Sequence, residues 1–381
     1  MCCILRVDWS KYPLTQQIWE EFGRMSLRER RVFLKEHSLQ YTQGHVPQCE
    51  DCLHVFFNCQ CNNQEFQERK KLWLKELSKS FEEKLRHSED IVREKTQLIK
   101  DNNLKIVLAY SGGIDSECCL QLFKEPISQG VIKVIVGNTT SELPDTYKRW
   151  REAEQELGVK FMYGLPERGT TFESNANIFG LPVYSRNACV VMAGEKKHIK
   201  REESSSQSRR STIMCCFNLK DKPQKLLLKG YDGDILGLKA TESRGRSISL
   251  KKTGDCFFSN DMKWHIRPIA WWTIDDEWEF QKEKGFKYNG IYDKTNCGTK
   301  GKYKLSTGGY YKIRSGCAYC PQGIHNGYLE WLKEYYPTYF NKLVNIYNNV
   351  SAKHNDGIDF NKVLEIKKVK NPSLFSSSVF S

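Results

Sequence analysis

The segment SGGIDS, residues 111–116, combines the groups that bind a phosphate. Gly112 and Gly113 allow the backbone N–H groups to approach a ligand closely, and Ser111 and Ser116 offer hydroxyl groups. Asp115 can help to hold a Mg²⁺ ion that is bound to pyrophosphate. The segment therefore predicts a phosphate-binding loop, and the alternative is an ordinary turn between a strand and a helix.

The sequence on either side of this loop predicts the elements that position it. Residues 104–110 (LKIVLAY) form a short apolar run typical of a strand, and residues 115–124 are typical of a helix. A helix that begins directly after the glycines presents its positive end to a phosphate. The loop lacks the Gly-Lys-Ser/Thr ending of a Walker loop.

Further elements of the same kind follow the loop. Residues 131–136 and 159–163 are predicted strands, and a predicted helix between them begins at Pro144 and ends at Gly158. Alternation of strands and helices predicts an α/β fold with a doubly wound parallel sheet. The first loop of such a sheet is a common phosphate site, so the motif lies where this fold would place it.

The chain divides into three predicted regions. Residues 1–100 form a helical, cysteine-bearing N-terminal region, with one long amphipathic helix, or two, over 64–100. Residues 101–350 form the α/β domain, and residues 351–381 form a tail. Within the domain we expect a strand at 235–240, a mobile loop at 202–212, a helix from a capping box at Thr273 to Gly285, and two helices over 326–349 broken at Pro337.

Composition limits the class of protein. The net charge of +13, from 59 Lys and Arg against 46 Asp and Glu, favours a nucleotide or a nucleic acid as partner, with a solvated basic surface as the alternative. No apolar run approaches the ~20 residues of a membrane span, and the N-terminus does not resemble a signal peptide. We therefore expect a cytoplasmic protein with no membrane contact, whose 15 cysteines favour metal ligation over disulfides.

Cysteines from two distant segments could form one metal site. Cys215 and Cys216 lie about 100 residues before Cys317 and Cys320, and four thiolates suit a [4Fe–4S] cluster or a tetrahedral zinc ion. Cys297 could replace Cys215 as a ligand or act as a working thiol. Isolated buried cysteines without metal are the alternative.

A second group of four cysteines lies close together in the N-terminal region. Four cysteines within 13 residues are a candidate Zn²⁺ knuckle, although their spacing is irregular and the absence of a metal is the alternative: Cys49, Cys52, Cys59 and Cys61. Four other cysteines are expected to be core residues: Cys118, Cys119, Cys189 and Cys256.

The complete SGGxDS pattern resembles the pyrophosphate loop (PP-loop) of the ATP pyrophosphatase superfamily, which has the adenine nucleotide alpha hydrolase-like fold. Other segments, in the same order, resemble motifs of the phosphoadenosine phosphosulfate (PAPS) reductases: 138–147, 214–223, 237–244, 267–278 and 316–321. The resemblance covers about residues 104–345.

The resemblance implies a nucleotide site and a [4Fe–4S] cluster on Cys215, Cys216, Cys317 and Cys320. The basic residues Lys239, Arg244 and Arg246 could clamp phosphate oxygens or the substrate. The expected nucleotide-binding residues are Ser111, Gly112, Gly113, Ile114, Asp115, Ser116, Asn138, Lys239 and Arg244, and the expected catalytic residues are Asp115 and Ser116.

Two departures from the reductases change the expected reaction. The loop keeps the form found in the ATP-cleaving relatives, and no cysteine follows Cys320 to attack a sulfate sulfur. Both favour ATP with Mg²⁺, and adenylation of a substrate for sulfur transfer, as in the DNA phosphorothioation sulfurtransferases. DNA or tRNA and a sulfur donor protein would then be partners. The alternatives are a PAPS or adenylyl-sulfate reductase that uses an external thiol, and a non-catalytic nucleic-acid-binding scaffold.

Overall fold

The computed structural model describes residues 10, 14–37, 64–181, 215–306, 308–320 and 327–354. The chain divides into two compact units, Met1–Lys79 and Ser80–Ser381. None of the helices in the described ranges is long and apolar enough to cross a membrane. The cysteines of the candidate zinc knuckle, Cys189, the predicted loop at 202–212 and the tail from residue 355 lie outside the described residues.

The first unit contains three described helices: α1 (Gln16–Arg24), α2 (Leu27–Glu36) and α3 (Gln64–Leu77). Trp19, Phe22 and Phe33 form a small aromatic core between α1 and α2, with ring centroids 5.1–6.1 Å apart. The region expected to hold one long helix or two holds two, because α3 ends at Leu77 and Ser80 caps the next helix, α4 (Phe81–Asp101).

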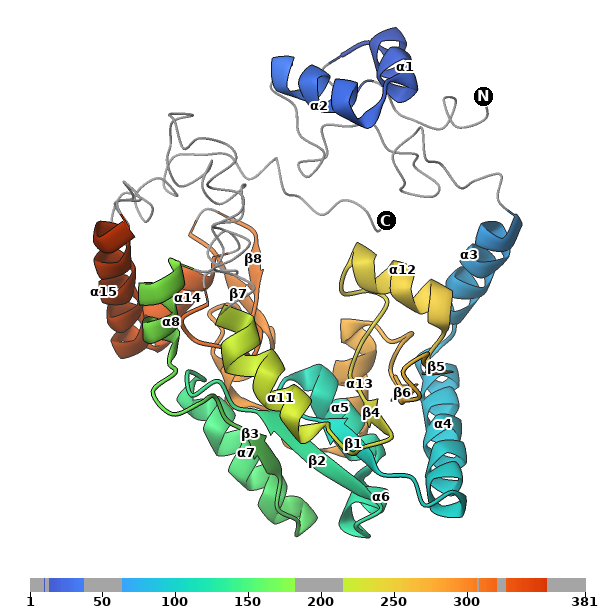
Figure 1. Cartoon of the computed structure of the whole chain (residues 1–381). Coiled ribbons are helices and arrows are strands. Elements are labelled where there is room, and N and C mark those ends of the chain that lie inside the picture. The colour runs from blue at the N-terminus through green and yellow to red at the C-terminus, as the bar shows by residue number, and fades with distance from the viewer. Residues whose placement is uncertain are drawn as a thin grey trace. The chain divides into compact units, whose positions relative to one another are not determined.

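The second unit is built on a six-stranded sheet in the spatial order β3-β2-β1-β4-β6-β5 (Figure 1). Its strands are β1 (Ile106–Ala109), β2 (Ile132–Gly137), β3 (Met162–Gly164), β4 (Gly233–Ile235), β5 (Cys256–Phe258) and β6 (Trp264–Ile266). All neighbours are parallel except β5, which runs antiparallel to β6. The α/β prediction with a parallel sheet led by the strand before the glycine loop is confirmed.

Helices and a hairpin surround this sheet. They are α5 (Ile114–Leu122), α6 (Lys124–Ser128), α7 (Pro144–Leu157), α8 (Phe172–Phe179), the π-helical turn η5 (Phe217–Asp221), α11 (Lys222–Leu227), α12 (Arg244–Thr253), α13 (Ile274–Lys284), the 3₁₀ turn η6 (Gly290–Asp293), the hairpin strands β7 (Lys302–Lys304) and β8 (Tyr310–Lys312), α14 (Tyr328–Tyr335) and α15 (Pro337–His354). The central strand β1 is buried along Ile106, Val107 and Leu108, which are at most 1% exposed. Its continuous apolar sequence follows from this burial, because helices cover both faces of a parallel sheet.

Buried polar contacts attach α4 to the segment that leads into α13. Lys84 Nζ lies 2.9 Å from Asp276 Oδ2, and both side chains are almost fully buried. Ser88 Oγ donates to the Pro268 carbonyl and accepts a hydrogen bond from Trp272 Nε1. Helix α4, which we expected in the N-terminal region, is part of the second unit. Its buried contacts hold the start of α13 in place.

Most element boundaries agree with the sequence predictions. The helix α7 begins at Pro144 and stops at Gly158, whose φ of +67° lies in the left-handed region. The capping box of α13 forms between Thr273 and Asp276, and Pro337 opens α15. The strand expected at 235–240 is wrong, because β4 ends at Ile235. The chain then turns so that Gly237 lies against the backbone of Asp115.

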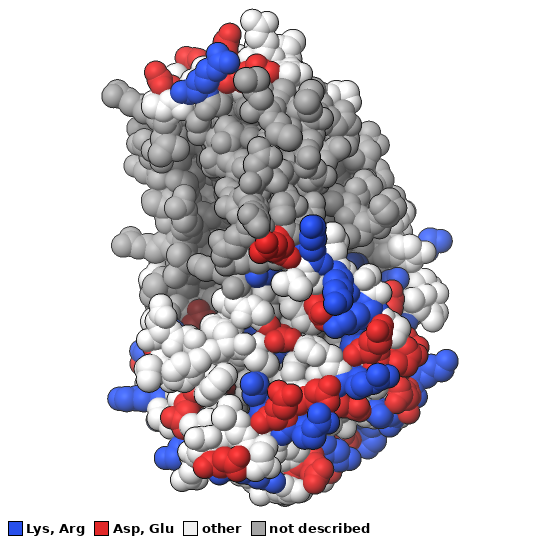
Figure 2. Space-filling view, turned by 90° about the vertical axis from the view of Figure 1, so that its right-hand side faces the viewer, with Lys and Arg blue, Asp and Glu red and all other residues white. Residues whose placement is uncertain are grey.

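Charges of both signs are mixed on the side of the molecule shown in Figure 2, which is the right-hand side of Figure 1 and carries α4. Lysine and arginine side chains alternate there with aspartate and glutamate. In the described part of this face, the positive charges are therefore not gathered into one patch.

Candidate active site

The glycine loop joins β1 to α5 as the sequence predicts. Gly112 has a φ of +76°, and Gly113 is the extended N-cap residue of α5. A Cβ atom at Gly112 would stand 2.8 Å from Trp150 Nε1, and one at Gly113 would stand 2.6 Å from Ser315 Oγ. Backbone conformation and close packing therefore both require glycine at position 112, whereas a side chain at position 113 would displace the Ser315 hydroxyl.

The two serine hydroxyls shape this loop from within. Ser116 Oγ donates to the Gly113 carbonyl at 2.9 Å and lies 3.1 Å from Ser111 Oγ. The Gly113 N–H donates to Ser111 Oγ at 3.3 Å. Ser116 is buried whereas Ser111 is exposed, so Ser111 is the hydroxyl that a ligand can reach.

Two residues from the η6 region hold the loop from a distant part of the sequence. The Tyr292 hydroxyl accepts the Ile114 N–H at 3.0 Å, and Asn289 Nδ2 donates to the Gly112 carbonyl at 3.0 Å. Both side chains are buried, and burial raises the pKa of Tyr292. The first N–H groups of a helix have no acceptor within the helix. In α5 the Ile114 N–H already donates to Tyr292 and is not available to a ligand.

Asp115, Lys239 and Glu277 form a charged cluster beside the loop. Lys239 Nζ pairs with Asp115 Oδ1 and lies 2.5 Å from Glu277 Oε2. The side chains of Lys239 and Glu277 are 4% and 0% exposed, whereas that of Asp115 is 32% exposed. Lys239 therefore lies beside the loop, and its binding of nucleotide stays a prediction. Glu277, from the first turn of α13, is a residue that the sequence did not single out.

The pKa values of the two carboxyl groups in this cluster are shifted in opposite directions. Burial and the neighbouring Asp115 raise the pKa of Glu277 well above its usual range. Burial acts on Asp115 as well, but hydrogen bonding with Glu277 and the charge of Lys239 outweigh it and lower the pKa of Asp115. Neither oxygen of Glu277 accepts a well-aligned hydrogen bond from the described residues, which agrees with a protonated carboxyl that donates to Asp115.

Two further cations act on the same carboxylate. The charges of Lys239 and Arg314 both lower the pKa of Asp115, and Asp115 in turn acts on Arg246 of α12. Arg246 also pairs with Glu242. Arg244 is the first residue of α12, and its side chain lies outside the described part of the structure.

Asn138 follows β2 at the same edge of the sheet, where the carboxyl end of β2 lies beside that of β1. Its Oδ1 accepts hydrogen bonds from the Thr140 N–H at 2.8 Å and from the Tyr147 hydroxyl at 3.4 Å. Asn138 therefore shapes the neighbouring loop, and its binding of nucleotide stays a prediction.

The predicted ligand cysteines lie near enough to one another to influence each other's pKa. Burial raises the pKa of Cys215 to about 12, and the charges of Cys216 and Cys320 contribute to the shift. Burial raises the pKa of Cys317, with contributions from Glu142, Cys320 and Cys215. Cys216 is exposed, and after burial Asp221 is the largest influence on its pKa.

This arrangement is not a ready metal site. Across the described ranges, no group of three or more His, Cys, Asp or Glu side chains is placed to hold a metal ion. Cys297 stays in its own loop, where Thr295 Oγ1 lies 3.4 Å from its Sγ. Hydrogen bonding with Thr295 and the backbone of Thr299 lowers its pKa. Cys118 and Cys119 are fully buried, as expected of core residues, and Cys256 is partly buried.

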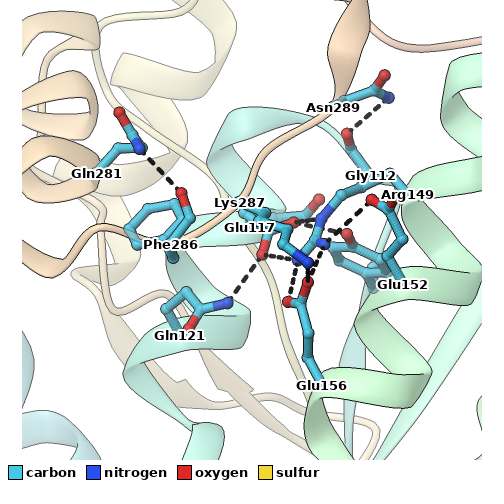
Figure 3. Close-up of polar contacts among 12 residues, drawn as sticks. Gly112, Glu117, Gln121, Arg149, Glu152, Glu156, Gln281, Phe286, Lys287 and Asn289 are labelled. Carbon is cyan, nitrogen blue, oxygen red and sulfur yellow. Dashed lines mark hydrogen bonds and ion pairs between the residues drawn. The ribbon is translucent and has the colours of Figure 1, made fainter.

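A buried ionic network supports the loop through Glu117, in the first turn of α5. Arg149 of α7 donates to both carboxyl oxygens of Glu117 at 2.9–3.0 Å and to both of Glu156 at 2.8–2.9 Å (Figure 3). The Tyr110 hydroxyl donates to Glu117 Oε2 at 2.6 Å. Burial disfavours the charge of Arg149, but the hydrogen bonds to Glu156 and Glu117 outweigh burial and raise its pKa. No local sequence pattern predicts this network, because its members come from three separate segments of the chain.

Comparisons with known proteins address the same region. Residues 105–323 match the family model of the phosphoadenosine phosphosulfate reductase domain. An adenosine 5'-phosphosulfate reductase of Oceanobacillus iheyensis is 33% identical over 95 residues, which make up 24% of this chain and 37% of that protein. The chain thus spans little more than a third of the length of that curated relative.

Solved structures give weaker similarities. A PAPS reductase of Candida auris, in a phosphate complex, aligns over 60% of this chain and 90% of its own, with 14% identity and a TM-score of 0.37. An NH3-dependent NAD synthetase of Campylobacter jejuni aligns over 72% of this chain and 97% of its own, with 13% identity and a TM-score of 0.30. Scores this low give no basis for transferring a function.

Proposed function

This chain belongs to the phosphoadenosine phosphosulfate reductase domain family, and on that premise we propose that it is an ATP pyrophosphatase that adenylylates a substrate for sulfur transfer. The family points to an enzyme of nucleotide and sulfur chemistry. The observation that carries the more specific proposal is the cluster of Asp115 and Lys239 beside the Gly112-Gly113 turn, at the positive end of α5.

Each part of the loop has a role in this proposal. The Gly112 N–H and the exposed Ser111 hydroxyl would bind the β and γ phosphates, joined by the Gly113 N–H once Ser111 turns to the ligand, while the ammonium of Lys239 compensates their charge. Mg²⁺ on the triphosphate would neutralise further charge, and Asp115 is the carboxylate that would hold it, directly or through water. The lowered pKa of Asp115 keeps this carboxylate ionised at neutral pH.

The proposed reaction has two steps. An oxygen of the acceptor attacks the α phosphorus of ATP, the bond between that phosphorus and the bridging oxygen breaks, and pyrophosphate leaves with the bonding electron pair. A sulfur nucleophile from a donor protein then forms a bond to the activated acceptor, and AMP leaves with the acceptor oxygen. Lys239, Arg246 and Arg314, which interact electrostatically with Asp115, would stabilise the charge that develops on the leaving groups.

The proposal extends to the cysteines near residues 138–143, the segment that follows β2. Cys215, Cys317 and Cys320 would supply thiols for a [4Fe–4S] cluster only after rearrangement, and Cys216 would have to turn inward from its exposed position to complete the set. A bound cluster would supply a positive centre that holds these thiols as thiolates, against the raised pKa values of Cys215 and Cys317.

A reductase of PAPS or adenylyl sulfate is the second candidate, favoured by the sequence identity to the Oceanobacillus reductase. Incubation with ATP or with PAPS, each with and without a thiol reductant, separates the two. Release of pyrophosphate from ATP supports the adenylation proposal. Formation of sulfite from PAPS without pyrophosphate from ATP contradicts it, and nucleic-acid binding with no turnover of either nucleotide favours a scaffold.

A further inference from the structure

The β7–β8 hairpin has one buried face and one exposed face. The two strands pair Lys302 with Lys312, Tyr303 with Tyr311 and Lys304 with Tyr310. Tyr303 and Tyr311 are 5% and 6% exposed, and side chains alternate along a strand. The opposite face is therefore formed by four residues: Lys302, Lys304, Tyr310 and Lys312.

The exposed face is basic and carries an aromatic ring. Residues 294–329 contain six Lys and Arg and no Asp or Glu, although the whole chain has an excess of only 13 positive charges. Tyr310 is 59% exposed. Among the described residues, no ion pair neutralises Lys302, Lys304 or Lys312.

Acidic residues near the hairpin are engaged elsewhere. Glu334 of α14 accepts a hydrogen bond from the hydroxyl of Tyr303, which lies on the buried face. Glu330 accepts the N–H and the hydroxyl of Ser306 in the turn. Neither carboxylate forms an ion pair with Lys302, Lys304 or Lys312 in the described part of the structure, so these ammonium groups are available to an external partner.

Both ends of the hairpin reach the glycine loop. The Gly301 N–H, directly before β7, donates to the Tyr292 carbonyl, and the Tyr292 hydroxyl accepts the Ile114 N–H. After β8, Arg314 acts on Asp115, and Ser315 packs against Gly113. A chain bound along the hairpin would thus lie next to the proposed nucleotide site.

We propose that the exposed face of this hairpin binds a single-stranded nucleic acid, which is the acceptor that the enzyme activates. This inference rests on the proposed function. Lys302, Lys304 and Lys312 contact backbone phosphates, and the ring of Tyr310 stacks on a base. An exposed ring among lysines suits an unpaired base, whereas an acidic peptide would use the lysines alone.

Fluorescence anisotropy tests the proposal. The probes are labelled single strands of about 20 nucleotides, one of DNA and one of RNA with the corresponding sequence. Replacing Lys304 and Lys312 by serine should weaken binding about tenfold or more and reduce the slope of log K against log salt by about 2. Replacing Tyr310 by alanine should weaken binding about tenfold and leave that slope unchanged. Stronger binding of one of the two strands identifies the source of the acceptor.

The matched control removes the same charge from the opposite edge of the sheet. Lys105 and Lys229 are exposed and precede β1 and β4, so Lys105→Ser with Lys229→Ser should leave affinity and salt slope unchanged. Equal weakening by the control, or competition by polyglutamate together with no effect of Tyr310→Ala, overturns the proposal.

A separate readout distinguishes this inference from the proposed function. If the hairpin variants bind like the wild type while Asp115→Asn abolishes pyrophosphate release from ATP, the hairpin inference fails and the adenylation proposal stands. If the hairpin variants lose binding but the wild type releases no pyrophosphate with any strand, the surface stands as a binding site and its role as acceptor site is refuted.

Discussion

Lys239 Nζ lies 2.5 Å from Glu277 Oε2, and neither side chain is more than 4% exposed. Lys239 also pairs with Asp115, the carboxylate at the first turn of α5. An acid from α13 is thus linked to the glycine loop through one buried lysine. The position of Lys239, and the ionisation of Asp115, depend on a residue far away in the sequence.

Replacement of Lys239 by methionine should impair both stability and turnover. It leaves Asp115 and Glu277 without their cation, and loss of one partner of a buried pair costs about 3–5 kcal/mol of unfolding free energy. Nucleotide turnover should fall about 10²-fold or more, because the charge that faces the phosphates is removed. Urea unfolding and pyrophosphate release measure the two effects.

Lys84→Met is the matched control, because Lys84 forms the other buried lysine ion pair, with Asp276. It should cost a similar free energy of unfolding, while the folded protein keeps its turnover. Equal loss of turnover in both variants would assign the effect of Lys239 to stability alone.

Glu277→Gln should change the pH dependence of stability. The pKa of Glu277 is raised in the folded state above its ordinary value of 4.5, so its contribution is complete below pH 4.5 and is lost as pH rises toward the folded pKa. Glutamine does not titrate and can still donate to Asp115. The variant should therefore gain on the wild type by about 1.4 kcal/mol per pH unit over this window. Urea unfolding at pH 5, 6 and 7 measures the difference, and a flat or falling difference contradicts the assignment.

Gly112→Ala should distort the glycine loop, and Gly130→Ala provides the comparison. Both glycines have a φ of +76°, but a Cβ atom at Gly130 meets no atom within 4 Å, whereas one at Gly112 meets Trp150. Each variant should lose about 1–2 kcal/mol of unfolding free energy through the backbone. Only Gly112→Ala should lose more than this and lose pyrophosphate release. Similar behaviour of the two variants would show that crowding at Trp150 is unimportant.

Arg149→Met should destabilise the fold, because it leaves Glu117 buried without a cation. The expected loss is about 3–5 kcal/mol of unfolding free energy. Addition of Glu117→Gln should recover part of this loss, since the uncompensated charge is then removed. Urea unfolding of the single and double variants checks this, and a double variant less stable than Arg149→Met would refute the role of the unpaired charge.

The sequence predicts the parts of this site that are continuous in the chain. The glycine loop, its flanking strand and helix, and the ends of α7 and α13 depend on neighbouring residues, so their signals are local. Lys239 could be predicted because a basic residue follows a strand end. Glu277 could not, since an acid in the first turn of a helix is ordinary and only the packing of α13 against α5 brings it to Lys239.

Other features depend on contacts that no local pattern reveals. Tyr292 and Asn289 reach the loop from about 180 residues away in the sequence. The strands of the β7–β8 hairpin have three residues each, which is too short for a periodic apolar signal. Which lysines share a face is therefore known only from the register of the two strands. The strand expected at 235–240 does not form, because β4 ends at Ile235. The chain beyond it packs Gly237 against the backbone of Asp115, a tertiary contact that no local pattern reveals.

Identifying which bond of ATP is cleaved tests the central claim most directly. Wild-type protein and Asp115→Asn should be incubated with ATP, Mg²⁺, a sulfur donor and single-stranded nucleic acid, and the nucleotide products quantified. The account predicts AMP and pyrophosphate in equal amounts from the wild type, reduced about 10²-fold or more in Asp115→Asn. Formation of ADP and phosphate instead, or equal amounts of AMP and pyrophosphate from both proteins, would contradict it.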